Sequence, residues 1–234
     1  MAFTKKEHME KISRIEDMEE EGLNIPRFVY LKKGSNVERL GHALIWAKEL
    51  QLSNPEQIFN IRTYDYSEKS EQETTSCPHI TDLTFEELIN QLPKVNTAFF
   101  CMIDAEIPDN GRMAGTIFIP EERNANFTLE FVIKEKRAMV RDINSKKGMI
   151  SLTGNMQIIA KYYDPENILE AAKRLSLPME SLHCQIISHI IKKALYFYKK
   201  GLIFEWTYFS IPSGRKYKGN SPESHIVWWE YRKP

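Results

Sequence analysis

The sequence predicts an α+β protein with two lobes, in which mainly antiparallel sheets are flanked by helices. Helical and strand-like segments alternate up to residue 104, whereas short strands follow one another from residue 111 to residue 163. Alternation in one part and a run of strands in the other favour this class over a single parallel sheet. We therefore expect an N-terminal α/β lobe at residues 1–105 and a C-terminal antiparallel lobe at residues 106–234. A hinge, if present, falls between Ile103 and Gly111.

The first lobe combines amphipathic helices with two strands. Its first helix carries apolar residues at three-residue intervals and ends at a glycine, Gly22. Thr84 and Glu87 form a capping box that opens a later helix. In chain order, the expected elements are a helix at Lys5–Glu21, an extended segment at Leu23–Leu31, a helix at Val37–Leu50, a strand at Ile58–Tyr64, a polar loop at Asp65–Pro78, the helix after Thr84 and a strand at Asn96–Asp104.

The second lobe contains short strands separated by turn residues, followed by helices and a final pair of strands. Its long helix has an apolar side and ends at basic residues followed by Gly201. In chain order, the expected elements are strands at Ala114–Ile119, Phe127–Ile133, Ala138–Ile143 and Asn155–Tyr163, a helix from Asp164, the long helix from Pro178, and strands at Leu202–Ser210 and His225–Arg232.

The amino-acid composition excludes some classes of function but does not identify a particular one. Hydrophobic residues make up 42% of the 234 residues and charged residues 27%, which is ordinary for a soluble globular protein. Lys plus Arg and Asp plus Glu both number 32, so the overall charge indicates neither a nucleic-acid nor an anionic-membrane partner. The three cysteines lack metal spacing, and their odd number suits a reducing compartment. No apolar run is long enough to span a membrane, and we expect a cytoplasmic protein.

Two acids interrupt the otherwise apolar final strands. By strand alternation, Glu205 shares a face with Ile203 and Thr207, whereas Glu230 and Arg232 share one with Ile226 and Trp228. A hairpin register that places Glu205 near Glu230 would bring two carboxylates together. A divalent cation such as magnesium, which takes carboxylates together with substrate phosphates, would neutralise them. The alternative is a structural ion pair between Glu205 and Arg232.

The same segments resemble the ATP-grasp family. The first segment is similar to the family's G-x-x-x-P motif, here Gly22 to Pro26, and the last strands are similar to its G-x-x-x-E strand, here Gly201 to Glu205, and to the acidic strand that follows. Arg62 occupies the place of a basic residue that holds nucleotide phosphates, as in the nucleotide domains of pyruvate phosphate dikinase and phosphoenolpyruvate synthase. The segment F-C-M-I-D-A-E of this chain is similar to the family's hinge strand. By that resemblance, Asp104 and Glu106 would contact adenine and ribose.

The resemblance implies binding of ATP and magnesium, together with ATP-dependent ligation or phosphoryl transfer. Glu205 and Glu230 would hold the metal, whereas Arg62 and Arg232 would contact phosphate oxygens and stabilise the transferred group. The partners would be the nucleotide and a small-molecule or peptide acceptor. Without catalysis, the same scaffold would bind nucleotide as a regulatory subunit.

Two departures from the family pattern stand out. The stretch from Tyr66 to His79, which corresponds to the family's phosphate-covering loop, contains no glycine, so close approach of its backbone to phosphates is harder. The family's Glu-x-Asn is here Glu230-Tyr231-Arg232, so a cation replaces one metal ligand.

Two alternatives remain open from the residues alone, and a third possibility, a histidine metal site, is disfavoured. Arg62 could form a structural ion pair with Asp65 or a nearby glutamate. The chain could be a binding module for single-stranded nucleic acid or a protein partner, through the basic stretch from Gly214 to Asn220 and its aromatic neighbours. His183 and His189 are six residues apart on one helix, a spacing that disfavours a shared metal site.

Overall fold

The computed structural model describes most of the chain, as two compact units. The residues it describes are 10–64, 78–107, 110–122, 126–135, 137–140, 143, 149–155, 169–170, 173, 180–196, 201–215 and 221–234. The first unit comprises Met1–Ser13 and Pro26–Asp109, and the second comprises Arg14–Ile25 and Asn110–Pro234. This division differs from the expected boundary at residue 105, because the segment from Arg14 to Ile25 belongs to the second unit. No helix within the described ranges is both long and apolar enough to cross a membrane.

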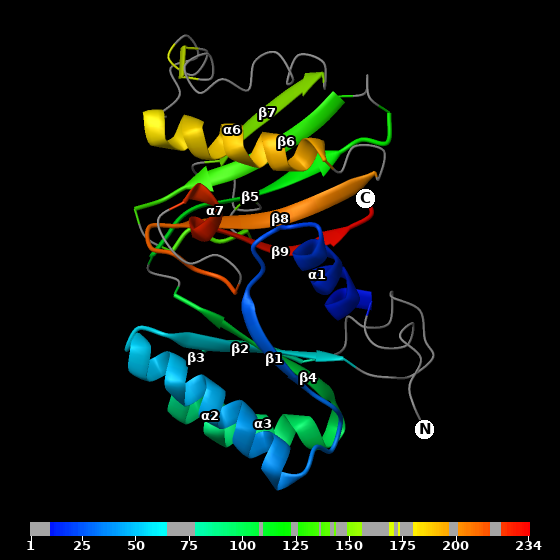
Figure 1. The fold of residues 1–234 in the computed structure, drawn as a ribbon, viewed down its shortest axis with the longest axis vertical. Coiled ribbons are helices and arrows are strands. Elements are labelled where there is room, and N and C mark those ends of the chain that lie inside the picture. Colours follow the sequence, from blue (N-terminus) through cyan, green and yellow to red (C-terminus); the bar gives the residue numbers. More distant parts are fainter. Residues whose placement is uncertain are drawn as a thin grey trace. The chain divides into compact units, whose positions relative to one another are not determined.

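The first unit is a four-stranded sheet with two helices on one face (Figure 1). Its strands follow the order β1-β4-β2-β3, and every neighbouring pair is antiparallel. The elements are β1 (Arg27–Leu31), α2 (Val37–Ser53), β2 (Ile58–Tyr64), β3 (His79–Leu83), α3 (Phe85–Ala98) and β4 (Phe100–Glu106).

The core of this unit lies between the helices and one face of the sheet. Phe59 and Ile61 of β2 and Ile103 of β4 pack with Ala47 of α2 and Leu88 of α3. These strand residues have odd numbers, so the even-numbered residues of β2 and β4 point to the opposite face. The predicted capping box is confirmed, because the side chains of Thr84 and Glu87 bond reciprocally to each other's backbone N–H groups.

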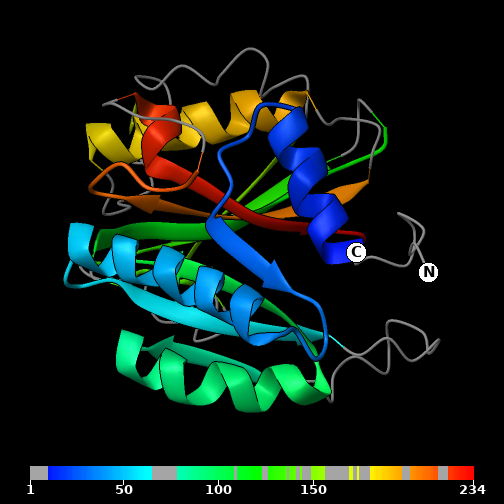
Figure 2. The same ribbon diagram turned by 60° about the horizontal axis from the view of Figure 1, so that its bottom comes forward.

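The second unit is a five-stranded antiparallel sheet in the order β7-β6-β5-β8-β9. Helix α6 and the part of α1 from Arg14 onward lie on the same side of this sheet (Figures 1 and 2). The elements are α1 (Glu10–Glu20), β5 (Gly111–Ile119), β6 (Asn126–Ile133), β7 (Met149–Asn155), α6 (Ser181–Leu195), β8 (Leu202–Phe209), α7 (Pro222–His225) and β9 (Ile226–Arg232).

The α+β class with mainly antiparallel sheets, predicted from the sequence, is confirmed. The end of α1 at a glycine is also confirmed, since Gly22 has a φ of 86° and the Leu23 N–H bonds to the Met18 carbonyl. The strand predicted at Ala138–Ile143 is wrong in its described residues, where Val140 and Ile143 adopt 3₁₀ geometry. Val140 packs against buried residues of the sheet, and Ala138 and Ile143 pack with it. These apolar side chains therefore lie on the face of the sheet and do not add a strand to it.

Three further elements differ from expectation. Strand β7 begins at Met149, so the strand predicted at Asn155–Tyr163 overlaps it only at Asn155, and residues 156–163 lie outside the described ones. Helix α3 continues through Ala98, which removes Asn96 to Ala98 from the predicted strand and moves β4 to Phe100–Glu106. Strand β3 was not predicted, because its sequence, H-I-T-D-L, is short and half polar. The predicted loop from Asp65 lies outside the described residues up to Cys77.

Candidate functional site

The predicted residues of the first unit meet on the sheet face that points away from α2 and α3. Asn60 and Arg62 of β2 and Asp104 and Glu106 of β4 all have even numbers, and Asn60 lies directly opposite Asp104 in the strand register. We call these four residues the β2–β4 polar cluster. The structure therefore brings together three residues predicted as ligands of the nucleotide, namely Arg62, Asp104 and Glu106.

Hydrogen bonds to Asp104 organise the cluster. Its Oδ2 accepts from Nε of Arg62 at 2.8 Å, and its Oδ1 accepts from Nδ2 of Asn60 at 2.7 Å. Asp104 is fully buried, whereas the Arg62 side chain retains 21% of its exposure. The contact uses one of the five N–H donors of the guanidinium and fixes its orientation. The sequence suggested Asp65 or a nearby glutamate as the partner of Arg62. Asp65 lies outside the described residues, and the described ion pair is with Asp104.

Glu106 is the most perturbed acid of the cluster. It is 7% exposed, and burial together with the nearby charge of Asp104 raises its pKa to about 7. A hydrogen bond from Asn60, at 3.4 Å from Glu106 Oε2, and the positive charge of Arg62 oppose this rise in pKa. At neutral pH the Glu106 carboxyl is thus divided between a form that donates a hydrogen bond and a form that only accepts.

The predicted residues of the second unit lie on β8 and β9. The expected register is confirmed, since Glu205 and Glu230 are Cα partners across the two strands. The expected face is wrong for Trp228, because the register shifts by one residue between Glu205 and Trp206. A bulge adds one residue to β9, so Glu230 faces the side of Glu205 while Trp228 faces the opposite side. The Phe204 ring accordingly contacts both Trp228 and Tyr231, with centroids 5.9 and 5.7 Å away.

Arg232 lies beside this pair of carboxylates. Its Nε is 3.7 Å from Oε1 of Glu205, which confirms the ion pair considered as the structural alternative. The Arg232 side chain is 47% exposed and that of Glu205 is 23% exposed, so the contact stabilises the fold by at most about 1 kcal/mol. Among the described residues, no group of three or more His, Cys, Asp or Glu side chains is arranged to hold a metal ion. Any magnesium at Glu205 and Glu230 would therefore depend on phosphate or water for its other ligands.

The sheet register places two further polar residues in line with the carboxylate pair, and sequence reasoning missed both. Thr116 of β5 is the Cα partner of Glu205 on one side and of Glu130 of β6 on the other. Glu230, Glu205, Thr116 and Glu130 therefore form a polar row across four strands on one face. The signal for Glu130 was present in the sequence, as an acid in the middle of the apolar strand F-T-L-E-F-V-I.

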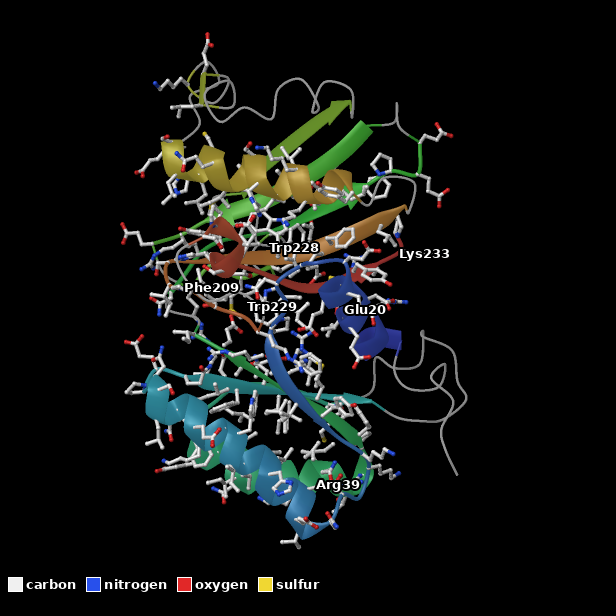
Figure 3. All side chains as sticks on the ribbon, in the orientation of Figure 1. Glu20, Arg39, Phe209, Trp228, Trp229 and Lys233 are labelled. Atoms are coloured by element: carbon white, nitrogen blue, oxygen red, sulfur yellow. The ribbon has the colours of Figure 1, made fainter. Side chains whose placement is uncertain are left out.

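The two tryptophans of the predicted nucleic-acid surface are buried and unavailable for stacking on bases. Trp228 is 3% exposed and Trp229 is 7% exposed, and both lie on β9 within the second unit (Figure 3). The Nε1 of Trp229 donates to Oγ1 of Thr207 at 2.9 Å, which fixes the ring inside the unit. Arg215 lies 3.7 Å from Glu19 of α1, and residues 216–220 lie outside the described ones. Trp228 and Trp229 therefore belong to the core of the second unit and do not form a stacking platform.

Comparisons with known proteins find solved ATP-grasp ligases and related enzymes at low similarity. No family model matches the chain, and no curated protein matches it. A crystal structure of an N5-carboxyaminoimidazole ribonucleotide synthetase with ADP is 10% identical, with a TM-score of 0.43, and covers 94% of this chain and 43% of that chain. The D-alanine-D-alanine ligase of Coxiella burnetii is 10% identical, with a TM-score of 0.41. The match covers 95% of this chain and 46% of that chain.

A third similar structure is a RiPP-associated ATP-grasp ligase from Chryseobacterium gregarium, in complex with ADP and a leader and core peptide. It is 10% identical, with a TM-score of 0.42, and covers 94% of this chain and 50% of that chain. The chain thus spans about half the length of these structures or less. The similarity to dikinase and synthase nucleotide domains stays a prediction.

Proposed function

We propose that this chain is an ATP-grasp-like protein that binds ATP with magnesium and uses it for ligation or phosphoryl transfer to a small-molecule or peptide acceptor. The observation that carries the proposal is the pairing of Glu205 with Glu230 across β8 and β9. Like charges directly opposite each other destabilise a sheet, and a divalent cation relieves that repulsion. Magnesium is commonly held by one or two carboxylates together with substrate phosphates. The pair would supply the carboxylates, and ATP would supply the phosphates.

The remaining roles follow from charge and position within each unit. Arg62, held by Asp104, would present its guanidinium to phosphate oxygens, and Arg232 beside Glu205 would do the same in the second unit. Asp104 and Glu106 would contact the ribose and adenine. Magnesium would supply charge neutralisation for the phosphates when bound. The contribution of this chain to chemistry is then mainly positioning and electrostatic stabilisation by Arg62 and Arg232.

Thermal unfolding with and without magnesium-ATP tests the proposal. A ligand that binds only the folded state raises the free energy of unfolding by about 2.7 kcal/mol at a hundredfold excess over its dissociation constant. We expect a rise in melting temperature that requires both ATP and magnesium. The rise should disappear in Glu205→Ala and in Glu230→Ala.

Glu130→Ala is a matched control, because Glu130 lies in the same polar row but outside the proposed metal ligands. It should keep the magnesium-dependent rise. The unliganded variants add a second readout. Glu230→Gln should be slightly more stable than the wild type without ligand, by a few tenths of a kcal/mol to about 1 kcal/mol, because the facing charges are removed. No shift at millimolar magnesium-ATP, or an equal shift in all variants, would overturn the nucleotide site.

A further inference from the structure

The first unit contains a pocket that the proposed nucleotide site does not use. It lies between the end of β1 and the first turns of α2, and its volume is about 410 Å³. Val29, Tyr30 and Leu31 of β1 form one wall, and Arg39, His42 and Ala43 of α2 form the other. Small-molecule sites in proteins occupy roughly 300–1,000 Å³, so the pocket can accept such a ligand.

The ionisable side chains that line the pocket are basic. Lys32, Arg39 and His42 are lining residues, and no acidic residue is among them. Arg39 and His42 are three residues apart on α2, a spacing that places both on the same side of the helix. In the part of the chain that the structure describes, neither side chain forms a salt bridge or a hydrogen bond. Arg39 lies near the start of α2, on the outside of the unit (Figure 3).

The sequence alone gave no reason to connect these residues. Arg39 and His42 follow a stretch of charged and polar residues that resembles an ordinary solvated helix face. Ala43 is the feature that makes room, because it is 5% exposed and its small side chain lies beside the two basic ones.

The dimensions of the lining favour a compact ligand over an extended peptide. Strand β1 is at the edge of its sheet and pairs with β4 alone among the described strands, so a peptide could in principle add to it. Such a peptide would run along all of Arg27–Leu31. The pocket is instead confined to the last three residues of β1, the lysine after them and one turn of α2. This shape fits one anionic group with a small body attached.

We propose that this pocket binds a small molecule that carries a phosphate or carboxylate group. Arg39 binds the anionic group through its planar fork of N–H donors, and His42 donates from its ring. Val29 contacts the body of the ligand. Binding at this pocket requires neither magnesium nor the β2–β4 polar cluster. The pocket proposal can therefore be tested independently of the proposed nucleotide site.

The test is a titration of the ¹⁵N-labelled full chain, followed by ¹H–¹⁵N correlation spectra in metal-free buffer. Sodium phosphate and sodium citrate are added separately at constant ionic strength, which sodium chloride maintains. We expect saturable shifts that cluster at residues 29–32 and 39–43, and the two probes identify which anionic group is preferred. In the double variant Arg39→Gln/His42→Gln, binding should weaken about tenfold or more, because charge-assisted hydrogen bonds are lost.

Lys48→Gln is the matched control, since it removes one positive charge from the same helix outside the pocket. It should bind as the wild type does. Arg39 and His42 are exposed, so the double variant should unfold at the wild-type temperature and loss of binding would not reflect loss of folding. The proposal would be overturned if neither anion shifts these resonances, or if sodium chloride alone shifts them as much as phosphate or citrate does. It would also be overturned if the shifts persist in the double variant. Binding of a hexaglutamate peptide without binding of either small anion would also overturn it.

Discussion

Nε of Arg62 donates to Oδ2 of Asp104 across 2.8 Å, from one strand of the first unit to its neighbour. Asp104 is fully buried, so its charge is compensated by this contact and by the hydrogen bond from Asn60 at 2.7 Å. The pair thus has a structural role in the unit even before any ligand is considered. That role can be measured separately from nucleotide binding.

We predict that Asp104→Asn lowers the free energy of unfolding by about 3 kcal/mol, because it removes the buried charge that Arg62 contacts at 2.8 Å. Urea denaturation measures the loss. The double variant Arg62→Gln/Asp104→Asn should recover part of it, since the two losses share one interaction. If the two single losses simply add, the contact contributes little to stability.

Glu106 should make the first unit less stable as the pH rises. Its pKa is raised from 4.5 to about 7 by burial and by Asp104, so the folded state binds the proton more tightly than the unfolded state. Stability from this group is therefore fully present below about pH 4.5 and is lost as the pH rises through about 7. The total loss is of order 3 kcal/mol.

Glu106→Gln should remove this dependence, because glutamine keeps the shape and an acceptor for Asn60 but cannot ionise. We expect the variant to melt at a higher temperature than the wild type at pH 8 and at a similar temperature at pH 5. Glu86→Gln, which removes an exposed acid of α3, is the control and should leave the pH profile unchanged. A parallel offset of the Glu106→Gln profile at all pH values would contradict the raised pKa.

Gly115 should tolerate no side chain. A Cβ built there would lie 2.7 Å from Cζ2 of Trp206 and 2.8 Å from Cβ of Phe131, and it would also meet the backbone carbonyl of Glu130. Both side chains are fully buried, so neither can move aside easily. Gly115→Ala should therefore destabilise the second unit by about 1–3 kcal/mol or more.

Gly41→Ala is the matched control in α2, where an added Cβ would have nothing within 4 Å. Alanine is a better helix former than glycine, so this variant should be more stable by about 0.5–1 kcal/mol. Chemical denaturation of the two variants should thus give shifts of opposite sign. Equal stability of Gly115→Ala and the wild type would show that the strands separate to admit the methyl group.

Local chemistry accounts for the parts of the fold that could be predicted. The capping box at Thr84 and the glycine end of α1 depend on a few neighbouring residues, and both are confirmed. The Glu205 and Glu230 register was also accessible, because strands that follow one another in the sequence commonly pair as neighbours. The four residues of the β2–β4 polar cluster include three that were predicted, and Asn60 was recognisable as the residue two before Arg62 on the same face.

Features that depend on distant contacts could not be predicted. A bulge changes the face of every later residue of β9, and nothing in I-V-W-W-E-Y-R marks its position. The segment Ala138–Ile143 has the composition of a strand, but packing against the sheet decides its structure. The pocket beside Arg39 depends on the strand that happens to lie next to Ala43. The burial of Trp228 likewise follows from the sheet around it.

The segment from Arg14 to Ile25 belongs to the second unit because Asn24 attaches its end there. Nδ2 of Asn24 donates to the carbonyls of Ser213 at 2.7 Å, Ile226 at 3.0 Å and Glu223 at 3.1 Å. The Asn24 carbonyl in turn accepts from the Trp228 N–H at 2.8 Å. Since Asn24 is 2% exposed, its amide satisfies buried carbonyls that water cannot reach.

Asn24→Asp is isosteric but replaces the donor with an acceptor that faces three carbonyl oxygens. We expect it to lower the free energy of unfolding of the second unit by about 3 kcal/mol, because buried polar groups lose their partners and gain repulsion. Amide exchange at Trp228 should become faster, which reports local detachment of the segment. Asn36→Ala, which removes the exposed N-cap of α2, should cost about 1 kcal/mol and leave Trp228 exchange unchanged. If Asn24→Asp leaves Trp228 exchange at the wild-type rate, the segment is held by its backbone and by Ile15 and Met18, and Asn24 is not what attaches it.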